Sequence, residues 1–329
     1  MVNINNVVIE PTIVNSSCAW ASDFAQLESL YECTSTGAVT TRTATLDGFK
    51  ENESHTVAFS SSSTTSLNSY GYSPHPLATY IKWIPQLLNG NHSTKQPQKP
   101  FIISITASKP DNLERMVNVI QELRTSIGDK DAKPSRIAIE LNTSCPNIPG
   151  SPPSAYESLS DSDTSLRSLL KVLQTAHQLD PTLTIGLKLP PFVYRQQFTD
   201  FITLLKQIGS GSDAKSFPIS FLTCTNTLGN SLMFSEEVDG GGKFKFAVPT
   251  ATGGLAGEAL HASALGNVFT FAELLAKDDE LKDIVIIGVG GVTTGQAASR
   301  MRQAGAKIVG CATLLGLEGV KAFETISRT

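Results

Sequence analysis

The chain has 329 residues, of which 40% are hydrophobic and 17% are charged, so it can bury a large core and is not a disordered polymer. Its formal net charge of -4 and pI near 5.8 exclude the basic surface on which nucleic-acid binders depend. A small-molecule ligand is the better expectation, and the length lies within the span that one (β/α)8 barrel fills.

The N-terminal segment MVNINNVVIEPTIVNSS has no Lys or Arg before a short apolar run, unlike signal or transit peptides. No apolar stretch approaches the length of roughly 20 residues that a membrane span needs. The cysteines are widely spaced, with no CxxC pair and no neighbouring His: Cys18, Cys33, Cys145, Cys224 and Cys311. We therefore expect a soluble, cytoplasmic protein with reduced thiols and no metal.

Short apolar or β-branched runs recur along the chain and predict strands buried on both faces. They are FIISIT (101–106), IAIELN (137–142), LTIGLKL (183–189), ISFLTCT (219–225), IVIIGVG (284–290) and KIVGCAT (307–313). Helices are predicted between them at 111–127 and 165–179. In the first, apolar residues recur at helical spacing at Leu113, Met116, Val117, Ile120 and Leu123.

This alternation of strands and helices predicts an α/β fold, either a closed barrel or an open doubly wound sheet. Residues suited to chemistry fall at the carboxyl ends of different predicted strands, where barrel enzymes assemble their sites. These residues are Asn142, Lys188, Asn226, Gly290 and Thr313. We predict a (β/α)8 TIM barrel as a single domain over residues 1–329, with loop insertions at its C-terminal face.

Three polar stretches predict exposed insertions. SSSTTS (61–66) is a Ser/Thr tract, and GSGSDAKS (209–216) is typical of a flexible connector. The Pro/Ser-rich stretch at 149–165 directly follows a predicted strand end, so we expect it to act as a lid.

The segment IELNTSCPNIPG (139–150) is the most informative. Asn142 ends a strand, and the Pro-stiffened loop after it presents Cys145 beside Asn147. Paired amides suit a flat ligand that contains an imide. A lone cysteine in a turn is usually only buried, but its amide neighbours favour a functional role here.

Two further features point to a cofactor. IIGVGGVTTG (286–295) and GCAT (310–313) follow the predicted seventh and eighth strands, where barrels bind phosphate through backbone N–H groups. Lys188 lies in an apolar strand, where an unpaired ammonium would be costly. We therefore expect it to form a salt bridge or to lie beside a cofactor that accepts negative charge.

Asparagine side chains are also predicted in separate loops. LNSYGY (67–72) contains Asn68 and LTCTNTLGNS (222–231) contains Asn226, in addition to Asn142 and Asn147. Each alone is an ordinary turn residue, but four together suit a planar polar ligand. The five histidines form no HxH or HExxH pattern, and no nucleophile elbow is present.

In order and spacing, ELNTSCPNIPG, LNSYGY, GLKLPP, TNTLGN, GGLAG (253–257) and IIGVGGVTTGQ resemble dihydroorotate dehydrogenases from about Asn15 to the end. The cysteine of the SCPN loop is similar to that of the soluble class 1 enzymes. No binding segment for an iron–sulfur subunit is evident, which favours the homodimeric, fumarate-using class 1A. The resemblance implies an FMN enzyme of pyrimidine biosynthesis.

The resemblance also implies roles. Cys145 is the base that removes the C5 proton of dihydroorotate while hydride passes from C6 to flavin N5, and Lys188 and Arg42 assist. The substrate-binding positions are Asn68, Tyr70, Gly71, Tyr72, Asn142, Asn147, Asn226 and Thr227. The cofactor-binding positions are Ser17, Cys18, Arg42, Thr43, Asn142, Lys188, Thr225, Gly254, Gly257, Gly290, Gly291, Ala312 and Thr313.

Several positions depart from the family pattern. Arg42 stands where the family carries a lysine, Cys18 where a glycine lies under the flavin, and Ala312 where a glycine is usual. The chain stops at Thr329, whereas similar proteins continue for another helical segment, so we expect a barrel uncapped there or a truncated sequence.

Three alternatives stay open: another FMN barrel oxidoreductase with a different cyclic substrate, a non-redox lyase or isomerase, and a non-catalytic flavin-binding homologue. The residues do not distinguish fumarate, quinone and oxygen as electron acceptors.

Overall fold

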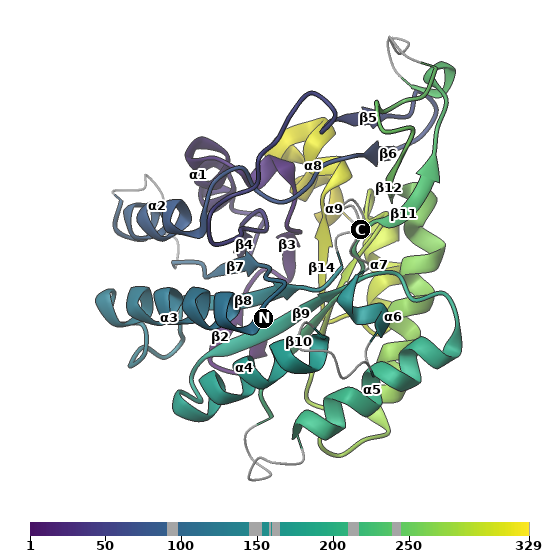
Figure 1. The fold of residues 1–329 in the computed structure, drawn as a ribbon. Coiled ribbons are helices and arrows are strands. Elements are labelled where there is room, and N and C mark those ends of the chain that lie inside the picture. Colours follow the sequence, from purple (N-terminus) through teal and green to yellow (C-terminus); the bar gives the residue numbers. More distant parts are fainter. Residues whose placement is uncertain are drawn as a thin grey trace.

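Eight parallel strands form the centre of the molecule in the computed structural model, which describes residues 1–90, 98–144, 153–157, 159, 165–209, 217–238 and 245–328 (Figure 1). In chain order they are β3 (Ile13–Asn15), β4 (Val39–Thr40), β7 (Phe101–Ile105), β8 (Ile137–Asn142), β9 (Thr184–Leu189), β10 (Phe221–Cys224), β13 (Val285–Val289) and β14 (Ile308–Cys311). Their order in the sheet is β3-β14-β13-β10-β9-β8-β7-β4, and a parallel bridge between Val14 and Ala38 joins its two edges. The predicted barrel is confirmed.

All six predicted strands are present, each within two residues of its predicted bounds. The sequence pattern did not reveal β3 and β4, which have three and two residues and carry too little periodicity. The glycine-rich loops follow β13 and β14, which are indeed the seventh and eighth barrel strands.

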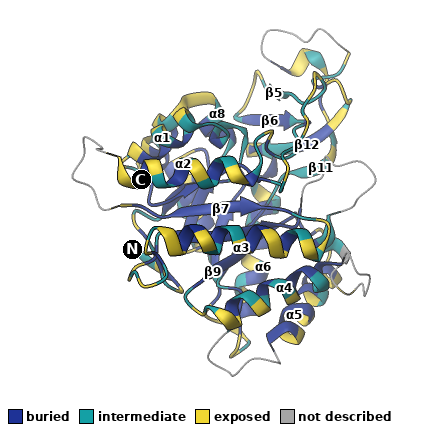
Figure 2. Ribbon diagram, turned by 60° about the vertical axis from the view of Figure 1, so that its left-hand side comes forward, coloured by how far each residue is buried: buried dark blue, intermediate teal, exposed yellow. Residues whose placement is uncertain are grey.

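Helices surround the barrel and turn their apolar faces toward it, with exposed residues on the outer side (Figure 2). They are α1 (Phe24–Glu32), α2 (Leu77–Asn89), α3 (Pro110–Ser126), α4 (Leu166–Leu179), α5 (Arg195–Gly209), α6 (His261–Ala276), α7 (Gly295–Gln303), α8 (Thr313–Glu318) and α9 (Ala322–Ser327). The helices predicted at 111–127 and 165–179 are α3 and α4. Side-chain caps begin several of them: Asp23 for α1, Ser165 for α4 and Thr294 for α7.

The amino end of the barrel is closed by a hairpin of β1 (Val2–Ile4) and β2 (Val7–Ile9). Ile4, Val7 and Ile9 belong to the same apolar cluster as Phe221 on β10. On the neighbouring strand, Gly186 leaves room for the Phe221 ring, because a Cβ at Gly186 would lie 2.3 Å from it. The barrel interior is therefore packed with apolar side chains at this end.

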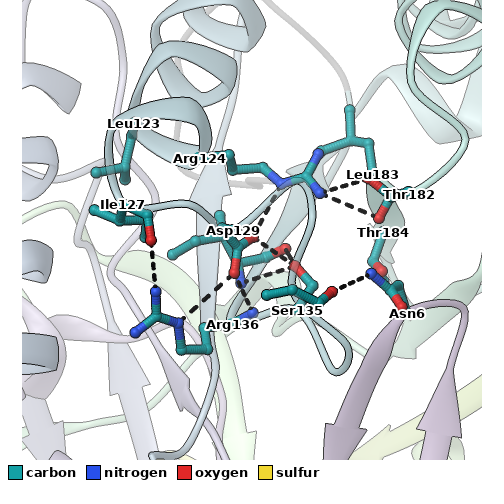
Figure 3. A network of polar contacts seen from close by, with 12 residues as sticks. Asn6, Leu123, Arg124, Ile127, Asp129, Ser135, Arg136, Thr182, Leu183 and Thr184 are labelled. Carbon is teal, nitrogen blue, oxygen red and sulfur yellow. Dashed lines mark hydrogen bonds and ion pairs between the residues drawn. The ribbon is translucent and has the colours of Figure 1, made fainter.

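A buried polar network ties the loops at the amino end together (Figure 3). Arg124 at the end of α3 is fully buried and pairs with Asp129 at 3.1 Å and with Asp180 at 2.6 Å. Asp129 also accepts hydrogen bonds from the Ser135 hydroxyl and the Arg136 backbone N–H. In (β/α)8 barrels, residues at the amino-terminal face usually contribute to stability rather than to the active site, and this network lies at that face.

A second, antiparallel sheet stands over the carboxyl end of the barrel (Figures 1 and 2). It contains β5 (Val57–Phe59), β6 (Thr65–Asn68), β11 (Leu228–Leu232) and β12 (Thr252–Gly257), in the order β11-β12-β6-β5. The prediction that 61–66 is an exposed insertion is wrong for its end, because Thr65 and Ser66 are buried in β6. β6 pairs with β12 on one side and with β5 on the other, and this pairing buries residues whose polar composition predicted an exposed loop.

The other predicted insertions fall mainly outside the described residues. Of 149–165, the structure describes a short 3-10 helix, Ser154–Glu157, in which Tyr156 donates a hydrogen bond to the Pro191 carbonyl oxygen. Of 209–216, it describes only Gly209, the last residue of α5. At the other end of the chain, α9 buries Ala322, Phe323 and Ile326, so a helix does pack on the barrel there.

In the described residues, one helical stretch, Glu258–Ala276, is long and apolar enough by length and composition to cross a bilayer. The sequence pattern did not single it out. Ala264, Val268, Phe271 and Leu275 of this stretch belong to the main core cluster. Core helices of soluble proteins pass the same test, so the stretch is weak evidence for a membrane span.

Candidate functional site

A pocket with an empty volume of about 1000 Å³, partly open to solvent, lies at the carboxyl ends of the barrel strands. This is where barrel enzymes place their sites. The pocket brings together most of the predicted residues: Ser17, Cys18, Arg42, Thr43, Asn68, Tyr70, Gly71, Tyr72, Asn142, Lys188, Thr225, Asn226, Thr227, Gly257, Gly290, Gly291, Ala312 and Thr313.

Three predicted residues remain. Cys145 and Asn147 lie outside the described residues, and the last residue described before them, Ser144, is hydrogen-bonded to the lining residues Asn142 and Asn226. Gly254 lies behind the lining on β12, where its carbonyl oxygen accepts a hydrogen bond from the Asn68 amide at 3.1 Å. A Cβ there would lie 2.3 Å from the Thr227 hydroxyl, so the glycine allows this close packing.

The Lys188 ammonium lies deep in the pocket and is 3% exposed. It donates to the Ser16 hydroxyl at 3.2 Å and to the Ser17 carbonyl oxygen at 3.1 Å, which reaches across the barrel from β9 to the end of β3. Both acceptors are neutral oxygens, and the ammonium lines the pocket. Lys188 was predicted to need polar partners, and the Ser16 and Ser17 oxygens are two of them.

Two asparagines form one polar wall. Asn142 accepts hydrogen bonds through Oδ1 from the backbone N–H and the hydroxyl of Ser144. The Asn226 amide donates to the Ser144 hydroxyl at 2.9 Å, and its own oxygen accepts from the Thr227 backbone N–H. Since a backbone N–H can only donate, these contacts fix which way both amides point.

Arg42 lies at the edge of the pocket and is held on several sides. Its Nη2 lies 2.6 Å from a Glu51 carboxylate oxygen, and its Nη1 donates to the Ser22 hydroxyl at 3.2 Å. The guanidinium also lies over the Tyr70 ring, 5.1 Å from its centroid. The planar fork of an arginine makes all three contacts at once, which a lysine could not.

The part of the pocket that follows β13 and β14 offers backbone groups. Gly290 and Gly291, after β13, have φ of 124° and 65°, and a Cβ on either would lie 2.5 Å from Ala264 or His261. In the part of the chain that the structure describes, no backbone acceptor takes the N–H of Gly291, Val292 or Thr313. Such N–H groups after the last two strands suit a phosphate.

Two thiols line the same pocket. Burial raises the pKa of Cys18 to about 11, against the lowering effect of its neighbours Lys188 and Arg42. Burial likewise raises the pKa of Cys311. Both therefore stay protonated near neutral pH and act as small apolar groups rather than nucleophiles.

One buried polar atom in the pocket supports a polar ligand. In the described residues, the Thr225 hydroxyl, 2% exposed, has no hydrogen-bond partner. Since a buried hydroxyl without a partner is costly, a bound group is expected to satisfy it. Together with the free N–H groups, this fits a cofactor that carries both a polar ring and a phosphate.

The sequence did not reveal part of the lining: Ser16, Ala19, Trp20, Val57, Ser66, Ala256, Leu260, Val289, Val292, Thr293, Cys311 and Leu314. Some adjoin residues that were predicted, such as Ser16 beside Ser17. Trp20 and Ser66 likewise lie two residues from the predicted Cys18 and Asn68. Val57 comes from β5, whose sequence carries no sign of a ligand, and only the position of this strand in the second sheet brings it to the pocket.

Residues 2–329 match the protein family described as Dihydroorotate dehydrogenase. The "Probable dihydroorotate dehydrogenase A (fumarate)" of Streptococcus pneumoniae serotype 4 is 30% identical over 292 residues, which cover 89% of this chain and 79% of that relative. The "Putative dihydroorotate dehydrogenase A (fumarate)" of Streptococcus pyogenes serotype M5 is 29% identical over 264 residues, covering 80% and 71%. That of Streptococcus equi subsp. equi is 26% identical over 297 residues, covering 90% and 81%.

Proposed function

Because the chain belongs to the dihydroorotate dehydrogenase family of flavin-dependent oxidoreductases, we propose that it binds FMN and oxidises (S)-dihydroorotate to orotate in pyrimidine biosynthesis. The observation that carries the proposal is the chemistry of the pocket lining. The loops after β13 and β14 offer backbone N–H groups that have no backbone acceptor among the described residues, and the strand ends and loops of β4, β8 and β10 offer the Arg42 cation and amides.

FMN would lie with its phosphate at the loops of Gly290, Gly291, Ala312 and Thr313. Its ring would contact the Thr225 hydroxyl, which otherwise has no partner among the described residues. When bound, FMN accepts a hydride from C6 of the substrate and passes the two electrons to an acceptor. Lys188 offers a cation that offsets the negative charge which the ring then gains.

Dihydroorotate would lie against the amide wall. Asn68, Asn142 and Asn226 line this part of the pocket with fixed donors and acceptors, which match the alternating N–H and C=O groups of a pyrimidine ring. Arg42 supplies a cation for the substrate carboxylate. Cys145 and Asn147, which lie outside the described residues, would complete the site from the loop after Ser144.

Cys145 acts as the base in this proposal. Its thiolate takes the proton from C5 of dihydroorotate, the C5–C6 double bond forms, and the hydride leaves from C6. A free thiol has a pKa near 8.5, so modest help from its surroundings makes it a base near neutral pH.

We further propose that the chain forms a homodimer and is located in the cytoplasm. We also propose that fumarate is the electron acceptor, because the names of the three streptococcal relatives specify fumarate, and two of these relatives cover 89% and 90% of this chain. Reoxidation assays with fumarate, menadione and oxygen on the dihydroorotate-reduced enzyme would rank the acceptors directly.

The first experiment is anaerobic mixing of the purified protein with dihydroorotate, followed by the visible flavin absorbance. We expect rapid bleaching for the wild type and for Cys33→Ala, the matched control outside the pocket, and no rapid bleaching for Cys145→Ala. Retained yellow colour in all three proteins would reject dihydroorotate as the substrate. A colourless protein that takes up no added FMN would reject the cofactor.

A further inference from the structure

A carboxylate, Glu140, is enclosed in the barrel beneath the pocket. It lies on β8, is 2% exposed, and forms no ion pair within 4 Å among the described residues. Its two oxygens instead accept hydrogen bonds from hydroxyls on two other strands: Ser104 on β7 at 3.1 Å and Thr223 on β10 at 2.7 Å. A buried carboxylate is costly, and nothing in the chemistry above uses it.

The Ser104 hydroxyl continues the contact toward the pocket. It lies 3.0 Å from the Thr43 hydroxyl, which lies 2.9 Å from the Ser17 hydroxyl. Thr43 also accepts a hydrogen bond from Nδ2 of Asn142 at 2.9 Å. Because Ser17, Thr43 and Asn142 line the pocket, a chain of polar contacts joins Glu140 to the pocket wall.

The donors in this chain can be assigned by counting. A hydroxyl has one hydrogen and two lone pairs, and an ionised carboxylate has only acceptors. Ser104 gives its hydrogen to Glu140, so it must accept the hydrogen of Thr43. Thr43 then has none left for Ser17, so Ser17 must donate to Thr43.

The Asn142 contact agrees with this assignment. The backbone N–H of Ser144 fixes Oδ1 of Asn142 on the far side, so Nδ2 faces Thr43 independently of the hydroxyl chain. Thr43 thus makes one donation and accepts two hydrogen bonds, which is its full capacity. Ser17 consequently turns lone pairs, not its hydrogen, toward the pocket.

We propose that Glu140 is a positioning residue for the flavin: through Ser104 and Thr43 it fixes the Ser17 hydroxyl as a hydrogen-bond acceptor for a donor group of the bound cofactor. This rests on the proposed function, because the ligand is taken to be a flavin. Without an acceptor at position 140, Ser104 can donate to Thr43, Thr43 to Ser17, and the Ser17 hydrogen then points at a donor.

The test compares two substitutions of Glu140. Glu140→Met removes the acceptor, while Glu140→Gln keeps a side-chain oxygen that can face Ser104. On dilution of each holoenzyme, release of free FMN is followed by its fluorescence. We expect the dissociation constant of FMN to rise about tenfold or more in Glu140→Met and to stay within about threefold of wild type in Glu140→Gln.

Thr223→Val is the matched control, because it removes the other hydrogen bond of the same carboxylate but leaves the chain to Ser17 intact. We expect wild-type FMN affinity for it. Ser104→Ala cuts the chain and should reproduce Glu140→Met, with no further loss in the double variant. Thermal unfolding of each apoprotein separates a folding defect from a binding defect.

Three results would overturn the inference while wild-type protein still binds FMN. They are unchanged affinity in Glu140→Met, equal losses in Glu140→Met and Glu140→Gln, and an equal loss in Thr223→Val. If the wild type itself does not bind FMN, the proposed function fails instead.

Discussion

Arg42 and Glu51 form an ion pair at the mouth of the pocket, with 2.6 Å between Nη2 and the carboxylate oxygen. Arg42 is 7% exposed and Glu51 is 28% exposed, so the pair is partly shielded from solvent. The Tyr70 ring lies against the same guanidinium, and burial raises the pKa of Tyr70. The Arg42 guanidinium, which lines the pocket, is therefore held in one direction before any ligand binds.

We expect Arg42→Met to raise the KM for dihydroorotate at least about tenfold, because a charged hydrogen bond is typically worth about 1.5–3 kcal/mol. The KM of Arg42→Lys should lie between those of wild type and Arg42→Met, since lysine keeps the charge but lacks the planar fork. Steady-state kinetics at fixed fumarate measure this. The exposed Arg195→Met is the control, and an unchanged KM in Arg42→Met would remove Arg42 from substrate binding.

The same pair predicts an opposite effect at Glu51. In Glu51→Gln the charge of Arg42 is no longer neutralised, so binding of the orotate anion should tighten by a few-fold, and this gain should shrink as salt is added. Titration of the flavin spectrum with orotate at low and high ionic strength reads this out. Weaker binding at both salt concentrations would mean that Glu51 mainly holds Arg42 in place.

Cys18 should resist alkylation at neutral pH. Burial raises its pKa to about 11, so the thiolate that reacts is scarce at pH 7 and accumulates only as the pH approaches 11. Iodoacetamide labelling of the flavin-free protein, quantified by peptide mass spectrometry, should rise steeply between pH 8 and pH 10. Rapid labelling of Cys18 at pH 7, with the protein shown to be folded, would contradict the shift.

Lys99 predicts a pH-dependent stability. Burial lowers its pKa from 10.5 to about 8, although the ammonium donates to the carbonyl oxygens of Leu30 and Cys33 and to the Thr36 hydroxyl. Between pH 8 and pH 10.5 the unfolded chain holds a proton that the folded chain has lost. Folding is therefore favoured as the pH rises through this window, by up to about 3 kcal/mol for this group.

The measurement is urea unfolding of wild type and Lys99→Met from pH 7 to pH 10.5, with the exposed Lys109→Met as control. The free energy of unfolding of wild type should rise relative to that of Lys99→Met across this range, and the difference should be flat below pH 7. A difference that does not change with pH would show that Lys99 keeps its proton when folded.

At the amino end of the barrel, Arg124→Met should lower the free energy of unfolding by about 3 kcal/mol, because it removes the nearest cation from the buried Asp129 carboxylate and leaves only Arg136, at 3.8 Å, to pair with it. The FMN affinity of the folded fraction should be unchanged, since the network precedes β8 and β9 at the amino end of the barrel and the pocket lies at the carboxyl end. Urea unfolding with the exposed Arg115→Met as control tests this. A loss in Arg124→Met no larger than in the control would show that Ser135 and Arg136 alone satisfy the Asp129 carboxylate.

Local patterns in the amino-acid sequence determined six barrel strands, the two glycine-rich loops and the polar residues at several strand ends, because β-branched runs give buried strands and polar residues or glycines follow them directly. Other lining residues, such as Ser17, Arg42 and Thr43, were expected only from the family resemblance. Parallel strands in a barrel bring all such ends to one face, so residues far apart in sequence could be assigned to one site.

Only the tertiary structure decided which side chains meet. β3 and β4 are too short to be recognised, and β6 pairs with β12, almost 190 residues later, to set Asn68 beside Gly254. Glu51 as the partner of Arg42, and Glu140 as the end of the hydroxyl chain, have no local mark in the sequence. Their contacts depend on strand register and barrel closure, which are long-range properties of packing rather than of any single segment.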